Sequence, residues 1–177
     1  MSKKRKVFKT VKAMTVAAML VAMSVIVGIF CKNFLNFGGG VFRITFENLP
    51  IILSGILYGP VAAGLVGVCA DLVSYLLSNQ IYPPNLVVTL GAAMVGVVSG
   101  VVSKYIVKKR GVANIIYSGA AAHIVGSMII KTIGLYSYFG ALVFLRIPLY
   151  IVIASVEILI LCLLLRRDSF AKVVDYR

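Results

Sequence analysis

The chain has 177 residues, of which 61% are apolar and only 13% are charged, and its mean hydropathy is +1.04. A soluble domain is roughly half apolar, and so few charged side chains cannot cover a globule of this size. The composition therefore excludes an ordinary soluble domain and predicts an integral membrane protein.

The basic residues account for the formal net charge of +13 without a nucleic-acid partner. Most of them fall in three clusters, at residues 1–12, 104–110 and 166–177, and each cluster adjoins an apolar stretch. Such clusters are typical of the cytoplasmic ends of transmembrane helices and can contact anionic lipid head groups. We therefore expect the lipid bilayer as a partner and no nucleic acid.

Six helices are predicted in chain order, because a spanning helix needs about 20 mostly apolar residues. They cover residues 13–30, 47–57, 61–77, 86–105, 113–135 and 142–165. Gly59 and Pro60 divide the second helix from the third, since proline cannot continue a helix and glycine readily ends one. The first stretch follows a basic start but lacks a clear small-x-small cleavage site, so we interpret it as a spanning helix rather than a signal peptide.

The segments between these helices are predicted as loops. They comprise residues 31–42 with three consecutive glycines, residues 78–85 with two prolines, a basic turn at 107–112 and an aromatic turn at 136–140. With the N-terminus in the cytoplasm, all but four basic residues lie on the cytoplasmic side, as the positive-inside rule requires. The sequence thus predicts an all-α bundle of six transmembrane helices, N-in and C-in. It forms one domain over 1–177, with cytoplasmic tails at 1–12 and 166–177 around a bundle at 13–165.

Ionisable side chains inside a bilayer cost ~2.5–3.5 kcal/mol each on insertion scales, so they usually have a function or a partner. Five of them fall toward the outer side of the predicted bundle: Arg43, Glu47, Asp71, Lys131 and Arg146. Most aromatic residues fall toward the same side. One interpretation is an interfacial aromatic belt with snorkelling cations. The other explains the asymmetry better: an outward-facing pocket with stacking walls and a cationic rim, suited to a flat anionic small molecule.

Two further ionisable residues, His123 and Glu157, lie near the middle of the fifth and sixth predicted helices. They can form either a buried hydrogen-bonded pair or a proton relay. We favour the structural pair, because one such pair on adjacent helices does not make a pump.

Small residues four positions apart let two helices approach closely. The first predicted helix has two such spacings, formed by Ala13 and Ala17 and by Ala18 and Ala22. They serve either packing within the bundle or docking of an external partner. A second set of small residues is predicted to pack internally: Gly64, Gly67, Gly96 and Gly100.

The sequence lacks the usual signatures of catalysis. It has no Gly-rich phosphate loop followed by Lys-Ser/Thr and no His-Glu-x-x-His zinc motif, and a single histidine without a Ser elbow does not support hydrolysis. The three cysteines are far apart and form no metal-binding spacing. We therefore expect no enzyme, no metal site and no cofactor in this chain. A solute-binding protein of this kind needs a partner that supplies energy.

The segment 43–60, RITFENLPIILSGILYGP, and the following Gly64, Gly67 and Asp71 resemble the substrate-binding S components of energy-coupling factor (ECF) vitamin transporters. The resemblance covers nearly the whole chain. It is greatest with the folate group, whose members have a similar Arg-x-x-Phe-x-x-Leu-Pro-Ile start to helix two and a Pro-containing loop before helix four. Here that loop reads Tyr82-Pro83-Pro84-Asn85-Leu86. S components for a queuosine precursor and for hydroxymethylpyrimidine share parts of this pattern.

The resemblance implies a high-affinity vitamin-binding subunit in a prokaryotic plasma membrane. Such a subunit binds its vitamin from outside and topples in the membrane to deliver it. A transmembrane coupling subunit and two cytoplasmic ATPases supply the energy, so that ATP is used by the partners. In the family, small residues of helix one contact the coupling subunit. The best match here is Ala18-x-x-x-Ala22, with Ala13-x-x-x-Ala17 second.

For folate, position and chemistry nominate a residue set for each part of the molecule. Aromatic walls for its flat rings would come from Phe46, Tyr75, Tyr82 and Tyr138. The donor-rich pterin edge suits a carboxylate such as Asp71, and Asn85 adds amide contacts. The glutamate carboxylates of folate need cations, for which we nominate Arg43, Lys131 and Arg146.

Other functions stay open at this point. One alternative is an S component for another vitamin or precursor, such as pyridoxine. Alternatively, the chain is a ligand-free structural subunit of a membrane complex, in which the outer charges form salt bridges. An intramembrane enzyme is a third class, which the scarcity of catalytic groups makes remote.

Overall fold

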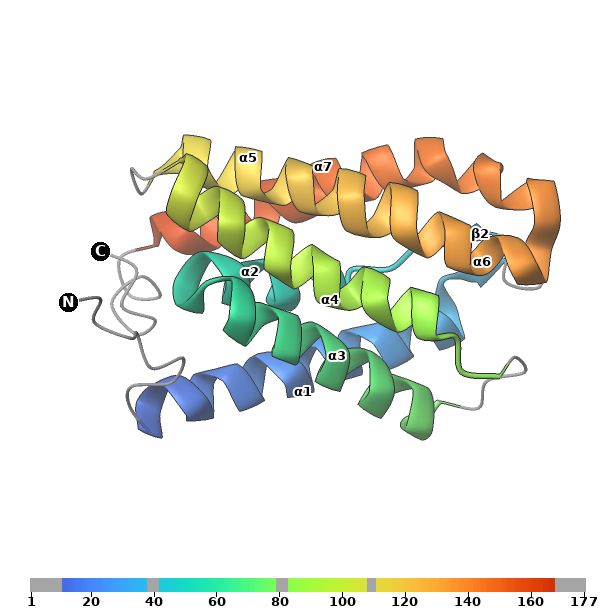
Figure 1. Ribbon diagram of the computed structural model, residues 1–177, viewed down its shortest axis with the longest axis horizontal. Helices are drawn as coiled ribbons and strands as arrows, with labels where there is room; N and C mark the ends of the chain where they lie inside the picture. The colour runs from blue at the N-terminus through green and yellow to red at the C-terminus, as the bar shows by residue number, and fades with distance from the viewer. Residues whose placement is uncertain (1–10, 38–41, 79–82, 108–110, 168–177) are drawn as a thin grey trace.

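Helices make up most of the computed structural model, which describes residues 11–37, 42–78, 83–107 and 111–167 (Figure 1). In chain order these elements are α1 (Val11–Phe34), α2 (Asn48–Tyr58), α3 (Pro60–Leu77), α4 (Leu86–Val101), the π-helix η2 (Val102–Ile106), α5 (Val112–Ala122), the π-helix η3 (His123–Lys131), α6 (Thr132–Phe139), the 3-10 helix η4 (Gly140–Leu145) and α7 (Arg146–Arg166). Between α1 and α2, the short strands β1 (Asn36–Phe37) and β2 (Phe42–Arg43) pair antiparallel.

The last α-helix begins at Arg146, after a 3-10 helix, and not at residue 142 as predicted. Two further helix ends also differ from the prediction. Helix α1 continues to Phe34, one turn beyond the predicted end, and this turn carries Lys32. Residues 136–139 belong to α6 and not to a turn. The chain turns instead at Gly140, whose positive φ of 55° is a conformation that glycine adopts without strain. Aromatic residues alone do not end a helix, whereas glycine commonly does.

Helix α2 is the centre of the bundle. It begins after Glu47 and ends at Gly59, and Pro60 starts α3 directly. With 11 residues it is only about 16 Å long, too short for a hydrocarbon core of about 30 Å. Its residues from Asn48 to Ile56 are buried, and it contacts α1, α3, α4, α5 and α7. The other helices therefore enclose α2.

Four helical stretches are long and apolar enough to cross a membrane: Ala13–Phe34, Pro60–Leu77, Leu86–Ile106 and Val112–Arg166. The last of these runs in one direction through α5 and α6 and returns through α7 (Figure 1). Large apolar side chains are exposed on all of these stretches, including Met19, Ile26, Leu65, Leu90, Ile124, Leu159 and Leu163. So much exposed apolar surface suits lipid and not water. The structure is thus an all-α membrane bundle.

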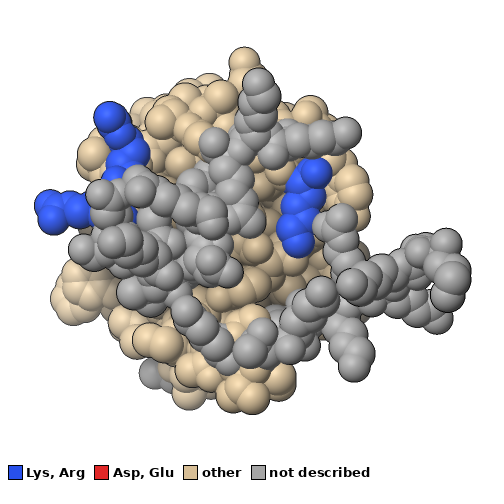
Figure 2. All heavy atoms as spheres, turned by 90° about the vertical axis from the view of Figure 1, so that its left-hand side faces the viewer, with Lys and Arg blue, Asp and Glu red and all other residues tan. Residues whose placement is uncertain are grey.

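The start of α1 and the end of α7 lie at the same end of the bundle (Figure 1). Figure 2 looks onto this end. Among the described side chains in view there, the charged ones are Lys or Arg. Lys104 belongs to the same region, because its Nζ donates to the carbonyl oxygen of Tyr58 at the C-terminal end of α2 (2.7 Å).

Glycines allow α3 and α4 to pack backbone against backbone. A Cβ on Gly67 would overlap the carbonyl oxygen of Ala92, and a Cβ on Gly96 would overlap that of Ala63. Gly64 and Gly100 are also buried and close to neighbouring helices. The prediction that these four glycines are internal packing sites is confirmed.

We expect Gly96→Ala to destabilise the bundle by about 1–3 kcal/mol, the usual cost of overpacking, although alanine is the better helix former. The measurement is thermal unfolding of the purified protein in detergent. Gly111→Ala is the matched control, because Gly111 is exposed and a Cβ there would meet nothing within 4 Å. Equal melting temperatures for the two variants would contradict the close contact between α3 and α4.

Candidate binding pocket

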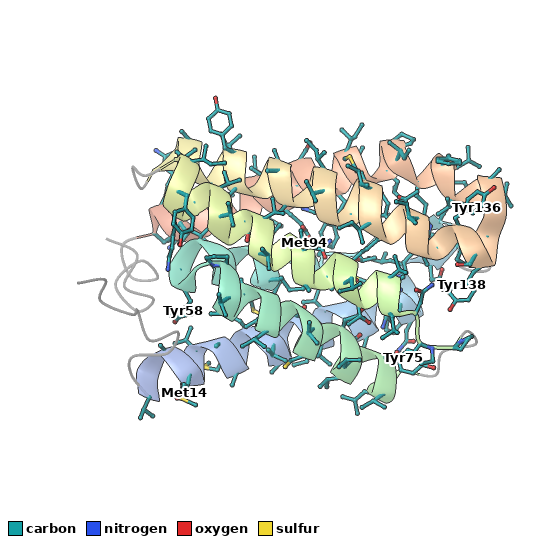
Figure 3. All side chains as sticks on the ribbon, viewed as in Figure 1. Met14, Tyr58, Tyr75, Met94, Tyr136 and Tyr138 are labelled. Carbon is teal, nitrogen blue, oxygen red and sulfur yellow. The ribbon has the colours of Figure 1, made fainter. Side chains whose placement is uncertain are left out.

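A cavity of about 290 Å³ opens at the end of the bundle opposite the start of α1. This volume is near the lower end of the range for small-molecule sites, about 300–1,000 Å³. Tyr75 and Tyr138, which both line it, lie at this end in Figure 3, whereas Met14 lies at the other. The lining comes from α1, both short strands, α2, α3, α4, η3, α6 and α7. Segments far apart in the sequence therefore meet around one site.

The segment that leads from β2 into α2 lines the cavity at several positions. They are Arg43 at the end of β2, Thr45 and Glu47 in the connection, and Asn48 at the start of α2. Phe46 is not among the lining residues. Its role as an aromatic wall for the ligand stays a prediction that this cavity does not support.

Glu47 joins two cations across the floor of the cavity. One of its carboxylate oxygens accepts a hydrogen bond from Arg43 Nη2 at 2.9 Å, and the other lies 3.3 Å from Lys131 Nζ. The side chains of Glu47 and Lys131 are 16% and 7% exposed. Charges this well removed from water need such partners, because an unpaired buried charge is very costly. This contact also fixes the start of α2 against η3.

Two lysines reach the cavity from different helices, Lys32 from α1 and Lys131 from η3. Lys131 Nζ also donates to Asn48 Oδ1 at 2.9 Å. Lys32 Nζ donates to Ser74 Oγ at 2.8 Å and to Ser78 Oγ at 3.3 Å, which connects α1 to the end of α3. Both ammonium groups are thereby held in place while they line the cavity.

Asp71 and Asn85 stand on the side formed by α3 and α4. An oxygen of the Asp71 carboxylate accepts a hydrogen bond from Thr89 Oγ1 at 2.7 Å. Asn85 caps α4 by accepting from the backbone N–H of Val87 (2.9 Å), and its Nδ2 donates to the carbonyl oxygen of Gly134 (2.7 Å). Asn85 therefore also has a structural role in the wall.

The remaining wall combines aromatic rings with a guanidinium. Tyr138 donates its hydroxyl to the carbonyl oxygen of Pro83 at 3.1 Å. The guanidinium carbon of Arg146 lies 5.1 Å from the centre of the Phe139 ring, within cation–π distance. Tyr150, one turn further along α7, lines the cavity beside them. This side offers both flat apolar faces and positive charge.

The structure brings most of the predicted site residues together. Those that line the cavity are Arg43, Asp71, Tyr75, Asn85, Lys131, Tyr138 and Arg146. Tyr82 lies outside the described residues. Sequence reasoning did not nominate several polar and aromatic lining residues: Lys32, Glu47, Asn48, Thr89, Phe139 and Tyr150. The sequence could have identified two of them. Glu47 is one of the acids that fall toward the outer side, and Tyr150 follows Arg146 by four positions, on the same face of one helix.

Four basic and two acidic side chains line the cavity: Lys32, Arg43, Lys131 and Arg146 against Glu47 and Asp71. If all are ionised, the cavity has a positive formal charge. Among the described residues, no group of three or more His, Cys, Asp or Glu side chains could hold a metal ion. The arrangement can therefore bind a small anionic molecule through cations, hydrogen-bonding groups and aromatic faces.

His123 and Glu157 lie outside the cavity lining, in the interior of the bundle. Their Nε2 and Oε2 atoms are 2.7 Å apart, and both side chains are fully buried. The predicted pairing of these two residues is confirmed.

The helix-one alanines differ in exposure. Ala17 is buried in the core and Ala13 is half-buried. Ala18 and Ala22 are exposed on the outer surface of α1. Only the second spacing therefore presents both of its small residues to the outside.

The chain is similar to known proteins in sequence and in fold. A family model described as "ECF transporter, substrate-specific component" matches residues 12–169. The fold is similar to the one in the "Crystal structure of FolT bound with folic acid", with a TM-score of 0.66 and 21% identity, over 86% of this chain and 93% of that one. A curated relative from Mycoplasma pneumoniae (strain ATCC 29342 / M129), "Uncharacterized protein MG098 homolog", is 26% identical over 95 residues. The match covers 54% of this chain but only 19% of that relative's length.

We expect Glu47→Ala to lower the free energy of unfolding by about 3 kcal/mol, because it leaves two largely buried cations without their carboxylate. Thermal or denaturant unfolding in detergent measures the change. The control is Lys131→Met, alone and combined with Glu47→Ala. If the contact is as described, the double variant loses clearly less stability than the sum of the single losses. Simple additivity would contradict it.

Proposed function

The chain belongs to the family of substrate-specific components of ECF transporters, and from this premise we propose that it is the high-affinity folate-binding subunit of an ECF-type importer. Its family consists of transport components and not enzymes, which agrees with the prediction that the chain is not an enzyme. The observation that carries the proposal is the cavity, in which cations, carboxylates and tyrosines from distant segments meet.

The lining residues match the parts of folate in kind. The pterin edge is rich in donors and suits the Asp71 carboxylate. Tyr75 and Tyr138 offer faces for the flat rings. The negatively charged glutamate part suits Lys131, Arg146 and Arg43, to which the structure adds Lys32 from α1. The similarity of the fold to a protein solved with folic acid supports this choice of vitamin.

Delivery into the cell follows the scheme that the family implies. The proposed subunit binds its vitamin from outside and then topples while docked on a transmembrane coupling subunit, with two cytoplasmic ATPases as the consumers of ATP. Ala18 and Ala22 are the proposed docking residues, because both are exposed on α1 and small residues permit close helix approach. The exposed apolar surface of the bundle supports rotation within lipid.

Orientation is part of the same proposal. The basic residues near the ends of α1 and α7 favour a cytoplasmic position for that end, which turns the cavity to the outside. The proposal therefore includes six membrane-embedded helices with both termini in the cytoplasm of a prokaryotic cell.

A reporter fusion tests the orientation. A fluorescent protein fused after Arg177 should be active in the cytoplasm, and an alkaline phosphatase at the same position should be inactive. The same reporters inserted beside the glycine-rich segment 38–40 should give the opposite result, with an active phosphatase, because the proposal places this segment outside the cell. An active phosphatase after Arg177 would refute the proposed topology.

Ligand binding tests the function directly. The purified protein should contain a co-purified pterin, detected by absorbance and mass, and should bind added folic acid in calorimetry. Lys131→Ala and Arg146→Ala should each weaken binding by about 1.5–3 kcal/mol, the scale of a hydrogen bond to a charged group. Arg167→Ala is the matched control, since this arginine is exposed beyond the end of α7.

The possible results separate the alternatives. A co-purified queuosine precursor, hydroxymethylpyrimidine or pyridoxine would keep the S-component assignment and replace folate. A protein that binds none of these would favour a ligand-free structural subunit. Unchanged affinity in both cation variants would refute the cationic part of the site while leaving the vitamin open.

A further inference from the structure

A line of buried polar side chains leaves the floor of the cavity and ends in the middle of the bundle. It begins at Lys131, whose Nζ donates to Asn48 Oδ1 at 2.9 Å. Asn48 Nδ2 donates to Ser127 Oγ at 3.3 Å, and Ser127 Oγ lies 3.5 Å from His123 Nδ1, the longest link. His123 Nε2 lies 2.7 Å from Glu157 Oε2. All five side chains are buried.

The chemistry of these groups gives the line a direction. An ammonium only donates, so Asn48 turns its oxygen toward Lys131 and its NH₂ toward Ser127. The Ser127 hydroxyl then has its own proton left for His123 Nδ1. The other ring nitrogen, Nε2, lies 2.7 Å from Glu157 Oε2. With the ring proton on Nε2, every group of the line would donate in the direction of Glu157, which is the arrangement that the measurement below tests.

We propose that Asn48, Ser127, His123 and Glu157 are positioning residues that hold the Lys131 ammonium at the wall of the ligand site. The proposal rests on the proposed function, in which Lys131 binds an anionic part of the ligand. A lysine ammonium is a point charge on a flexible stem, and fixing it before binding removes an entropic cost from association. Hydrogen bonds that run in one sense also strengthen one another in a buried site.

The backbone supports this arrangement. His123, Ser127 and Lys131 follow one another at intervals of four in η3, the π-helix that forms the middle of the stretch from α5 to α6. Such wide turns are rare and occur frequently at functional sites. Asn48 comes from the start of α2 and Glu157 from α7. The line thus ties three elements to a single side chain in the cavity.

The competing explanation is that these contacts only bind α7 and α2 to η3. In that case, removing any one of these side chains would lower the stability of the protein, whether residue 131 is lysine or methionine. A positioning role instead lowers ligand affinity, and only while the lysine is present. A double-mutant cycle on affinity separates the two.

The cycle uses folic acid as the probe and purified full-length protein in detergent, with the dissociation constant measured by calorimetry. Ser127→Ala should weaken binding about fivefold, the effect of one hydrogen bond. Lys131→Met should weaken it at least as much, and the double variant should bind no more weakly than Lys131→Met. Ser118→Ala is the matched control, because Ser118 is a buried serine of α5 whose hydroxyl bonds to no described residue. Its affinity should equal that of the wild type.

A second measurement needs no ligand. His123 is the only histidine of the chain, so a ¹⁵N-histidine-labelled sample, purified with a tag free of histidine, gives one imidazole signal. Its nitrogen shifts should show the neutral Nε2–H form, and Ser127→Ala should remove this preference. Glu157→Gln retains an oxygen acceptor and should keep both the tautomer and the affinity, whereas Glu157→Leu should lose both.

The outcomes are distinguishable. Normal affinity in Ser127→Ala, or additive losses in the cycle, would overturn the positioning role while leaving the folate site intact. A charged imidazole or an Nδ1–H tautomer would overturn the donor order. If the wild type does not bind folic acid, the proposed function fails, and the imidazole signal still decides whether the directed line exists.

Discussion

The cost of holding charge inside an apolar bundle governs this structure. Glu47 lies between Arg43 and Lys131, with contacts of 2.9 and 3.3 Å, so that one carboxylate holds two cations where water is scarce. The same carboxylate marks the start of α2 and faces η3. A single cluster of charges therefore sets the place of the central helix, the floor of the cavity and the polarity that a solute meets there.

The sequence predicted those parts of the fold that depend on local chemistry. Gly59 and Pro60 separate α2 from α3 where they were expected to do so, because both residues act on the backbone directly. Lys32 was missed because its polar neighbours suggested that the first helix had already ended. The π-helices η2 and η3 were also not foreseen, since no residue type specifies the wider turn and tertiary packing decides it.

The site was predictable in composition but not in pairing. Arg43, Asp71, Lys131 and Arg146 were identified from the cost of ionisable groups in apolar stretches, and the structure collects all four around one cavity. The pair of Glu47 with Arg43 is local, four positions apart, whereas its contact with Lys131 joins residues 84 positions apart. Phe46 was nominated from its aromatic ring and its place in the chain, but it is not among the lining residues, because the order of residues alone does not say which way a side chain faces.

The shortness of α2 has a consequence for how the protein is made. A helix of 11 residues cannot cross the hydrocarbon core by itself, so it cannot enter the membrane as an independent span. It has to be inserted together with α3, from which only Gly59 separates it, and become enclosed when α1, α4 and α7 assemble around the pair. The cavity floor, where Glu47 meets Lys131, is therefore complete only when these helices have packed together, and a subunit caught before that step would be embedded in the membrane with an unfinished cavity.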